Sequence, residues 1–155
     1  VVEIMIRFMN AFVKITGWLP YALVFRTKYI YEDKKVQGRH IKGKAIIVSN
    51  HTAVWDYAQY LMTFFFRTLR VLAAEVLYKK ALLPVFLKLM WAIYVNRDNR
   101  DFSFIDKCNK ILSKDGVILA FPESRIPLKD EATPLEFKPS IAYLAYLSRA
   151  KVIPL

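Results

Sequence analysis

The residues best suited to chemistry in this chain are a histidine and an aspartate five positions apart, His51 and Asp56. On a regular helix, side chains five positions apart point about 140° away from each other, because each turn holds 3.6 residues. The two side chains can therefore meet only if His51 lies in a loop and Asp56 lies in the first turn of the helix that follows. An aspartate bonded to one imidazole nitrogen fixes the tautomer and leaves the other nitrogen available as a base. Taken alone, the pair fits better a structural helix start in which Asp56 only favours the helix dipole.

Two further groups of polar residues follow apolar stretches. Residues 121–125 read Phe-Pro-Glu-Ser-Arg and place Glu123 and Arg125 in a proline-bounded loop, and Asn96-Arg97 follows another apolar stretch. Arginine offers a planar fork that suits phosphate. By itself, the group at residues 121–125 fits better a surface turn with an exposed ion pair. The loop lysines Lys129 and Lys138 are expected to be solvated.

These residues favour one reaction class over others. The sequence has no serine elbow of the G-x-S-x-G type and no reactive-cysteine context, so nothing signals a covalent acyl-enzyme. The other histidine, His40, lies in a basic stretch, and no metal-ligand cluster or cofactor motif is evident. A histidine base with nearby arginines suits direct attack of a hydroxyl on a thioester. The thiol leaving group, with a pKa of about 8.5, can depart without a strong acid.

The elements that must position these residues alternate between strands and helices. Short apolar or β-branched segments predict strands at residues 44–48, 70–74, 93–96, 117–121 and 152–155. Helices are expected between them at residues 53–66, 81–90, 102–113 and 140–149. This alternation predicts an α/β domain with a mostly parallel central sheet flanked by helices. In such sheets, sites gather at the carboxyl ends of strands, where His51, Arg97 and Glu123 would lie.

Residues 1–25 are strongly apolar and predict a pair of membrane-associating helices. The polar residues Glu3, Arg7, Asn10 and Lys14 make one narrow helical stripe, and Gly17 and Pro20 interrupt the pattern. The longest uncharged stretch, residues 15–25, is shorter than the roughly 20 residues that a span needs. A bent helix pair lying in one leaflet is therefore expected, and an ordinary core helix is the alternative.

Composition agrees with a membrane partner. The formal net charge is +11 and hydrophobic residues make up 55% of the chain, a combination that favours an anionic membrane over nucleic acid. The single cysteine, Cys108, falls on the apolar face of a predicted helix and is expected to pack in the core.

Four ordered motifs make the chain resemble the glycerol-3-phosphate and lysophosphatidic acid acyltransferase family. The motif N-H-x-x-x-x-D matches Asn50, His51 and Asp56, and an arginine after a short apolar strand matches Arg97. The motif F-P-E-G-T-R resembles residues 121–125, and an apolar strand with a proline resembles Val152-Ile153-Pro154. Ser124 and Trp91 stand where the family commonly has glycine, Asn96 replaces a common aspartate, and the third motif is one residue shorter before Arg125.

The resemblance implies catalysis by His51 and Asp56 without a metal or other cofactor. It implies an acyl-CoA or acyl carrier protein donor, and a phosphate acceptor held by Arg97, Glu123 and Arg125 beside Asn50, Ser124 and Pro154. The expected product is phosphatidic acid, made from 1-acyl-glycerol-3-phosphate at the cytoplasmic membrane face. The expected organisation is a membrane-associating segment at residues 1–28 and a catalytic domain at residues 40–155 that is C-terminally incomplete. Another lyso-lipid acceptor, a hydrolase and a non-catalytic basic membrane-binding module remain alternatives.

Overall fold

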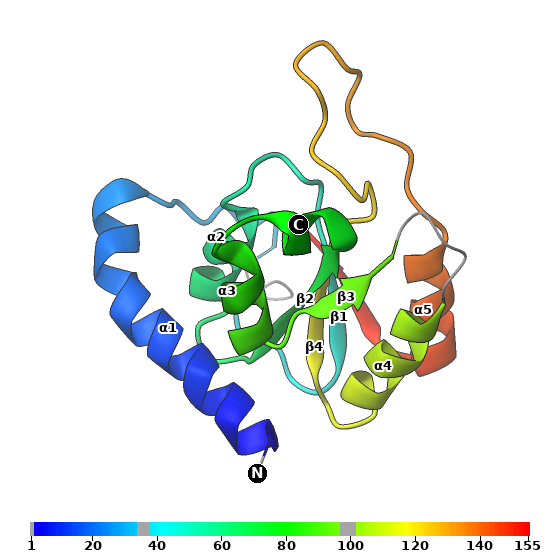
Figure 1. Ribbon diagram of the computed structural model, residues 1–155, viewed down its shortest axis with the longest axis horizontal. Coiled ribbons are helices and arrows are strands. Elements are labelled where there is room, and N and C mark those ends of the chain that lie inside the picture. Colours follow the sequence, from blue (N-terminus) through cyan, green and yellow to red (C-terminus); the bar gives the residue numbers. More distant parts are fainter. Residues whose placement is uncertain (1, 34–37, 97–101) are drawn as a thin grey trace.

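Five short strands form one parallel sheet in the computed structural model, which describes residues 2–33, 38–96 and 102–155 (Figure 1). Their order across the sheet is β3-β2-β4-β1-β5, and every neighbouring pair is parallel. The predicted α/β fold with a parallel central sheet is confirmed. The strands are β1 Ala45–Val48, β2 Leu69–Ala74, β3 Ile93–Val95, β4 Val117–Ala120 and β5 Lys151–Pro154.

Helices lie on both faces of this sheet. The predicted helices are observed within a few residues of their expected bounds, and a short 3-10 helix, η1, was not predicted. The largest difference is at α2, which begins at Asp56 rather than at residue 53, because the Asp56 carboxylate accepts the backbone N–H groups of Thr52 and Ala53 and holds them in a loop. The helices are α1 Val2–Val24, α2 Asp56–Thr63, η1 Glu75–Lys79, α3 Leu83–Leu89, α4 Ser103–Leu112 and α5 Ser140–Ser148.

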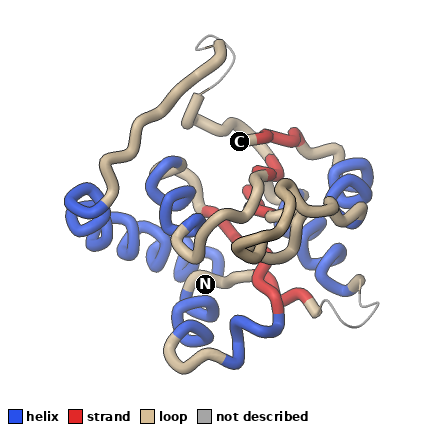
Figure 2. The backbone as a smooth tube through the Cα atoms, turned by 90° about the horizontal axis from the view of Figure 1, so that it is seen from above, coloured by secondary structure: helices blue, strands red, loops and turns tan. Residues whose placement is uncertain are grey.

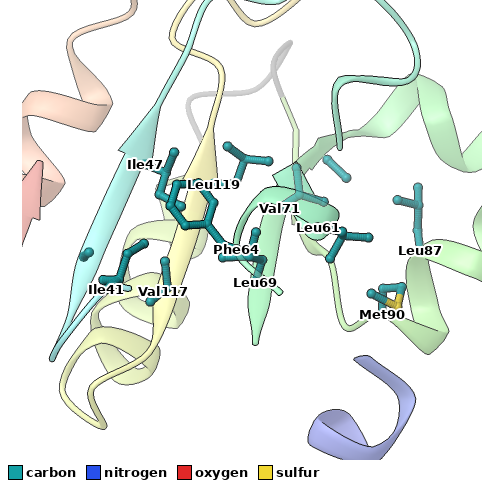
Figure 3. Packing of buried hydrophobic residues seen from close by; sticks show 12 residues of the cluster. Ile41, Ile47, Leu61, Phe64, Leu69, Val71, Leu87, Met90, Val117 and Leu119 are labelled. Carbon is teal, nitrogen blue, oxygen red and sulfur yellow. The ribbon is translucent and has the colours of Figure 1, made fainter. Parts of the chain in front are cut away.

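The sheet buries a different set of side chains on each face. Alternation along β1 sends Ile47 into a cluster with Leu61, Phe64 and Leu87 from the helical layer of α2 and α3 (Figure 3). Its neighbour Ile46 joins a second cluster built with α4 and α5. Cys108 is fully buried in that second cluster, as expected. Two layers of helices with a sheet between them leave the strand ends as the accessible edges of the domain.

The N-terminal segment is one continuous helix, α1, rather than the expected helix pair. Pro20 lies inside α1 without ending it. Proline removes the hydrogen bond to the carbonyl of the residue four positions earlier, here Thr16. Both residues are exposed, so this carbonyl is not trapped in the core. The break predicted from Gly17 and Pro20 is therefore wrong, because the helix continues through both residues.

Two residues of the polar stripe of α1, Asn10 and Lys14, turn toward the domain, and most of the apolar residues of the helix turn away from it. Asn10 and Lys14 are each only 2% exposed. Lys14 donates to the backbone carbonyls of Phe64, Phe65 and Arg67 at 3.0, 3.1 and 2.5 Å. The side chains that face outward are exposed by half or more: Ile4, Phe8, Phe12, Ile15, Trp18, Leu19, Leu23 and Val24.

This orientation differs from that of an ordinary core helix, which would bury most of its apolar residues. Among the helices of the described residues, none combines the length and the hydropathy that crossing a membrane requires.

Candidate active site

The loops that follow the strands gather at the carboxyl edge of the sheet. Seen from above in Figure 2, these loops cover that end of the molecule. The loop after β1 carries His51, and the long loop between β4 and α5 carries Glu123, Ser124 and Arg125. Parallel strands therefore bring together residues that lie more than 70 positions apart in the sequence.

His51 and Asp56 form a hydrogen-bonded pair in the predicted arrangement. The Nδ1–H group of His51 donates to Asp56 Oδ2 at 2.9 Å, which assigns the proton to Nδ1 because an ionised carboxylate can only accept. His51 lies in the loop after β1, and Asp56 is the first residue of α2. Nε2 is therefore the imidazole nitrogen that a substrate can use.

The loop fixes Asp56 more firmly than the histidine alone would. Its Oδ2 atom also accepts the backbone N–H groups of Thr52 and Ala53 at 2.8 and 2.9 Å, and the Thr52 hydroxyl donates to Oδ1 at 3.3 Å. The carboxylate is 4% exposed and lies at the start of a helix, where the dipole favours a negative charge. These contacts hold the carboxylate in place whether or not a substrate is bound.

An aromatic side chain supports the other side of the imidazole. The ring of Phe121 stacks on His51 with centroids 4.3 Å apart and planes 18° apart. Tyr60 of α2 contacts Phe121 and forms a short hydrogen bond with Ser49, two residues before His51. The imidazole is thus held by Asp56 at its edge and by Phe121 on its face.

A cavity of about 230 Å³ opens beside His51. Most of its wall is apolar, and its polar residues come from the two loops and the start of α5. The apolar wall comes from β2, η1, β3, α4, α5 and the loop after β4. Its residues are Leu72, Ala74, Val76, Leu77, Val95, Phe104, Phe121, Pro122, Ile126 and Ile141. Such a cavity suits a ligand with a hydrocarbon part and a polar group near the imidazole.

Sequence reasoning identified the polar residues of this cavity better than its apolar wall. Leu77, Phe104 and Ile141 belong to patterns that also predict core packing, so their sequence carries no separate signal. Lys138 was expected to be solvated; it is exposed and also lines the cavity. Its position just before α5, at the carboxyl edge, is the signal that could have identified it.

Glu123 and Arg125 occupy different environments in the loop after β4. Glu123 is 4% exposed, and within the described part of the chain its Oε2 atom has no hydrogen-bond partner. Arg125 lines the cavity together with His51 and forms a bidentate ion pair with Glu131. This guanidinium holds the pKa of Glu131 at about 2, so the pair is charged at neutral pH.

Ser124 lines the same cavity and has a left-handed backbone. Its φ is +64°, and that of Trp91 is +50°. Both stand where the resembled family commonly has glycine, the residue that adopts such angles without a steric cost. The two substitutions have therefore kept the backbone conformation that glycine favours.

The remaining predicted site residues are not gathered at the cavity. Arg97 lies outside the described residues. Asn50 is exposed beside His51, and Pro154 is exposed at the end of the edge strand β5, paired with Val48; neither lines the cavity. The arrangement as a whole can take a proton from a hydroxyl group at the mouth of an apolar cavity.

Comparison with known proteins gave one match. The model of a protein family described as acyltransferase matches residues 26–155, which is most of the chain. No curated protein and no solved structure matches.

Proposed function

This chain belongs to the acyltransferase family, and we propose that it transfers a fatty acyl group from a thioester to the free hydroxyl of 1-acyl-glycerol-3-phosphate, giving phosphatidic acid. The observation that supports this most is the hydrogen bond of 2.9 Å between His51 and Asp56 at the mouth of an apolar cavity. The family match supports acyl transfer in general. The choice of acceptor depends on the charged residues at the cavity.

In the proposed reaction, His51 Nε2 takes the proton of the acceptor hydroxyl while the oxygen attacks the thioester carbonyl carbon. The carbonyl re-forms as the carbon–sulfur bond breaks, and the thiolate leaves with the proton that His51 carries. Asp56 stabilises the imidazolium that exists between these two transfers. The donor is acyl-CoA or acyl carrier protein, and this route needs no metal or other cofactor.

The cavity suits the two parts of the substrates. The apolar wall of Leu72, Leu77 and Phe104 can hold the hydrocarbon chain. Arg125 lies at the same cavity and can exchange its pairing with Glu131 for the acceptor phosphate. Glu123 does not itself line the cavity; its buried Oε2 atom would accept a hydrogen bond from an arginine or from a hydroxyl of the glycerol. Asn50, Ser124 and Pro154 would complete the acceptor site.

The proposed location is a membrane surface at its cytoplasmic face. The outward apolar side chains of α1 support insertion into one leaflet. The net charge of +11 suits an anionic surface, which the cytoplasmic leaflet offers. Residues 1–28 would then associate with the membrane and residues 40–155 would carry out the reaction.

The test is acyl transfer by the purified protein, measured with a panel of lyso-lipid acceptors and both kinds of donor. His51→Ala is expected to lower the turnover by about 10²–10⁴-fold, the usual effect of losing a general base, while lipid binding persists. His40→Ala is the matched control, since His40 is an exposed histidine outside the cavity. Near-normal turnover by a folded His51→Ala protein would exclude His51 as the base.

A further inference from the structure

A second cavity, of about 510 Å³, lies at the edge of the sheet opposite His51. Its wall comes from α1, from the segment between α2 and β2, and from the turn that joins α4 to β4. Figure 1 shows the N-terminus of α1 at the end of the molecule away from the loop between β4 and α5. The proposed acyl transfer uses none of these residues.

A buried amide without a complete set of partners lies in the wall of this second cavity. The Oδ1 atom of Asn10 accepts the backbone N–H of Leu69 at 3.3 Å, which orients the side chain. Asn10 is 2% exposed, yet among the described residues its Nδ2 group has no hydrogen-bond partner. A buried donor left unpaired is costly, so this group needs an acceptor.

A buried positive charge lies beside that amide. Lys14 lines the same cavity, and its three N–H donors are taken up by three backbone carbonyls. In the described part of the chain, no carboxylate forms an ion pair with it; Glu3, the acidic residue on the same stripe, pairs with Arg70 at 2.6 Å. Burial lowers the pKa of Lys14 to about 8, so it stays charged at neutral pH. A nearby anion would offset this uncompensated charge.

The ionisable residues around the cavity have an excess of positive charge. Four cations, Arg7, Lys14, Arg67 and Lys114, face two carboxylates, Glu3 and Asp115, which leaves a net charge of +2. Arg7 is 71% exposed and lies 3.8 Å from Glu3, a distance at which it can turn toward a ligand. Lys114, in the turn between α4 and β4, is also exposed. The cavity therefore combines long-range attraction for an anion with donors that can contact it.

We propose that this second cavity binds the phosphate of an anionic lipid headgroup. A lipid fits better than a free phosphate because apolar side chains share the same wall: Ile15 of α1 is 67% exposed and Phe66 is 80% exposed. The headgroup would accept from Asn10 Nδ2, Arg7 and Lys114, and the acyl chains would lie along the outward face of α1. This binding is separate from the acceptor site and does not depend on acyl transfer.

The experiment measures binding of a water-soluble, short-chain phosphatidylglycerol to the full chain by calorimetry. Phosphatidylglycerol is chosen because it is neither the proposed acceptor nor the proposed product. One variant is Arg7→Gln/Lys114→Gln. The other is Asn10→Asp, which keeps the oxygen that Leu69 requires and replaces the unpaired donor with an anion. Arg26→Gln/Lys28→Gln is the matched control, because it removes two exposed cations next to α1 that do not line the cavity.

The wild type is expected to bind one lipid, and both cavity variants are expected to lose about tenfold or more in affinity, as the loss of charge-assisted hydrogen bonds predicts. The control pair should bind as the wild type does, and an uncharged short-chain diacylglycerol should not bind. Equal losses in the control pair would overturn the proposal in favour of general charge attraction. Inorganic phosphate that binds as tightly as the lipid would overturn the headgroup assignment. Unchanged affinity in both cavity variants would exclude the site.

Discussion

At the scale of single residues, the proposed base depends on a contact that the loop imposes. His51 and Asp56 meet because residues 52–55 form a loop that brings the histidine back over the first residue of α2. The backbone N–H groups of Thr52 and Ala53 hold the Asp56 carboxylate from the same side. Arg125, the proposed phosphate-binding residue, has no equally rigid support, since it is exposed and its partner Glu131 lies on the same loop.

Arg125→Ala is expected to raise the apparent Michaelis constant for the phosphorylated acceptor by about tenfold or more, with a smaller change for the donor. The reason is the loss of a charge-assisted hydrogen bond to phosphate. Arg125→Lys should restore little of the apparent affinity for the acceptor, because a point charge cannot reproduce the planar fork of arginine. Steady-state kinetics with each substrate varied in turn checks this. Lys129→Gln, which removes an exposed cation of the same loop, is the control. Unchanged acceptor dependence in Arg125→Ala would remove Arg125 from the site.

Ser124 offers a test of the backbone rather than of a side-chain contact. Both Ser124→Gly and Ser124→Ala remove the hydroxyl, but only glycine adopts a φ of +64° without a steric cost. We expect Ser124→Gly to have a free energy of unfolding up to about 1 kcal/mol higher than that of Ser124→Ala. Chemical denaturation of both variants measures the difference. A more stable alanine variant would show that the loop does not keep this conformation.

At the scale of elements, the strands were predictable and the helix starts were less so. Apolar runs such as residues 45–48 and 117–120 have few alternatives to a buried strand, and both were found within one residue of their predicted bounds. The start of α2 depends instead on the side chain of Asp56, whose backbone partners a hydrophobic pattern does not reveal. The 3-10 helix η1 was missed for a related reason, because a run of five residues is too short for a helical period.

The orientation of α1 was also beyond the reach of sequence patterns. The spacing of Asn10 and Lys14 identified one polar stripe, but a stripe facing water and a stripe facing backbone carbonyls have the same spacing. The carbonyls that accept hydrogen bonds from Lys14 belong to Phe64, Phe65 and Arg67, at the end of α2 and just after it. Only the packing of α1 on α2 shows that the lysine is buried.

Burial of Lys14 predicts a distinct pH dependence of stability. Its pKa is about 8 in the folded chain and 10.5 without burial, so between these values the unfolded chain holds a proton that the folded chain has released. The penalty for burying the charge is therefore complete below pH 8 and disappears as the pH approaches 10.5. Relative to Lys14→Met, the free energy of unfolding of the wild type should rise by up to about 3 kcal/mol over this range.

Denaturant unfolding of the wild type and of Lys14→Met, at several pH values from 7 to roughly 10.5, measures this difference in the free energy of unfolding. Lys107→Met is the control, since Lys107 is an exposed lysine of α4. Its difference from the wild type should stay constant with pH. A constant difference for Lys14→Met as well would show that burial does not perturb this lysine.

At the scale of the whole molecule, charge and apolar surface both support the proposed membrane association. α1 and α5 lie on opposite sides of the sheet in Figure 1. The outward face of α1 is a row of exposed apolar side chains. Beside it, the second cavity carries a net positive charge. A leaflet that receives the apolar row would bring its headgroups to this cavity, so the two features support the same orientation of the protein.

Replacing two outward phenylalanines tests this orientation without disturbing the packed side of α1. Phe8 and Phe12 are 65% and 52% exposed and stack on each other, with ring centroids 6.4 Å apart. Burying a phenylalanine side chain in an apolar phase is worth about 1.5–3 kcal/mol, so Phe8→Gln/Phe12→Gln should weaken partitioning into vesicles by about 100-fold or more. Vesicle flotation at high salt measures this weakening, because salt screens the contribution of the basic charge.

Tyr143→Gln/Tyr146→Gln, which removes two exposed aromatic side chains from α5, is the matched control and should partition as the wild type does. These point variants are sharper than deletion of residues 1–25, since the deletion would also strip Lys14 from the three carbonyls beyond α2. Equal partitioning of the phenylalanine variant and the wild type would place the membrane contact on another face.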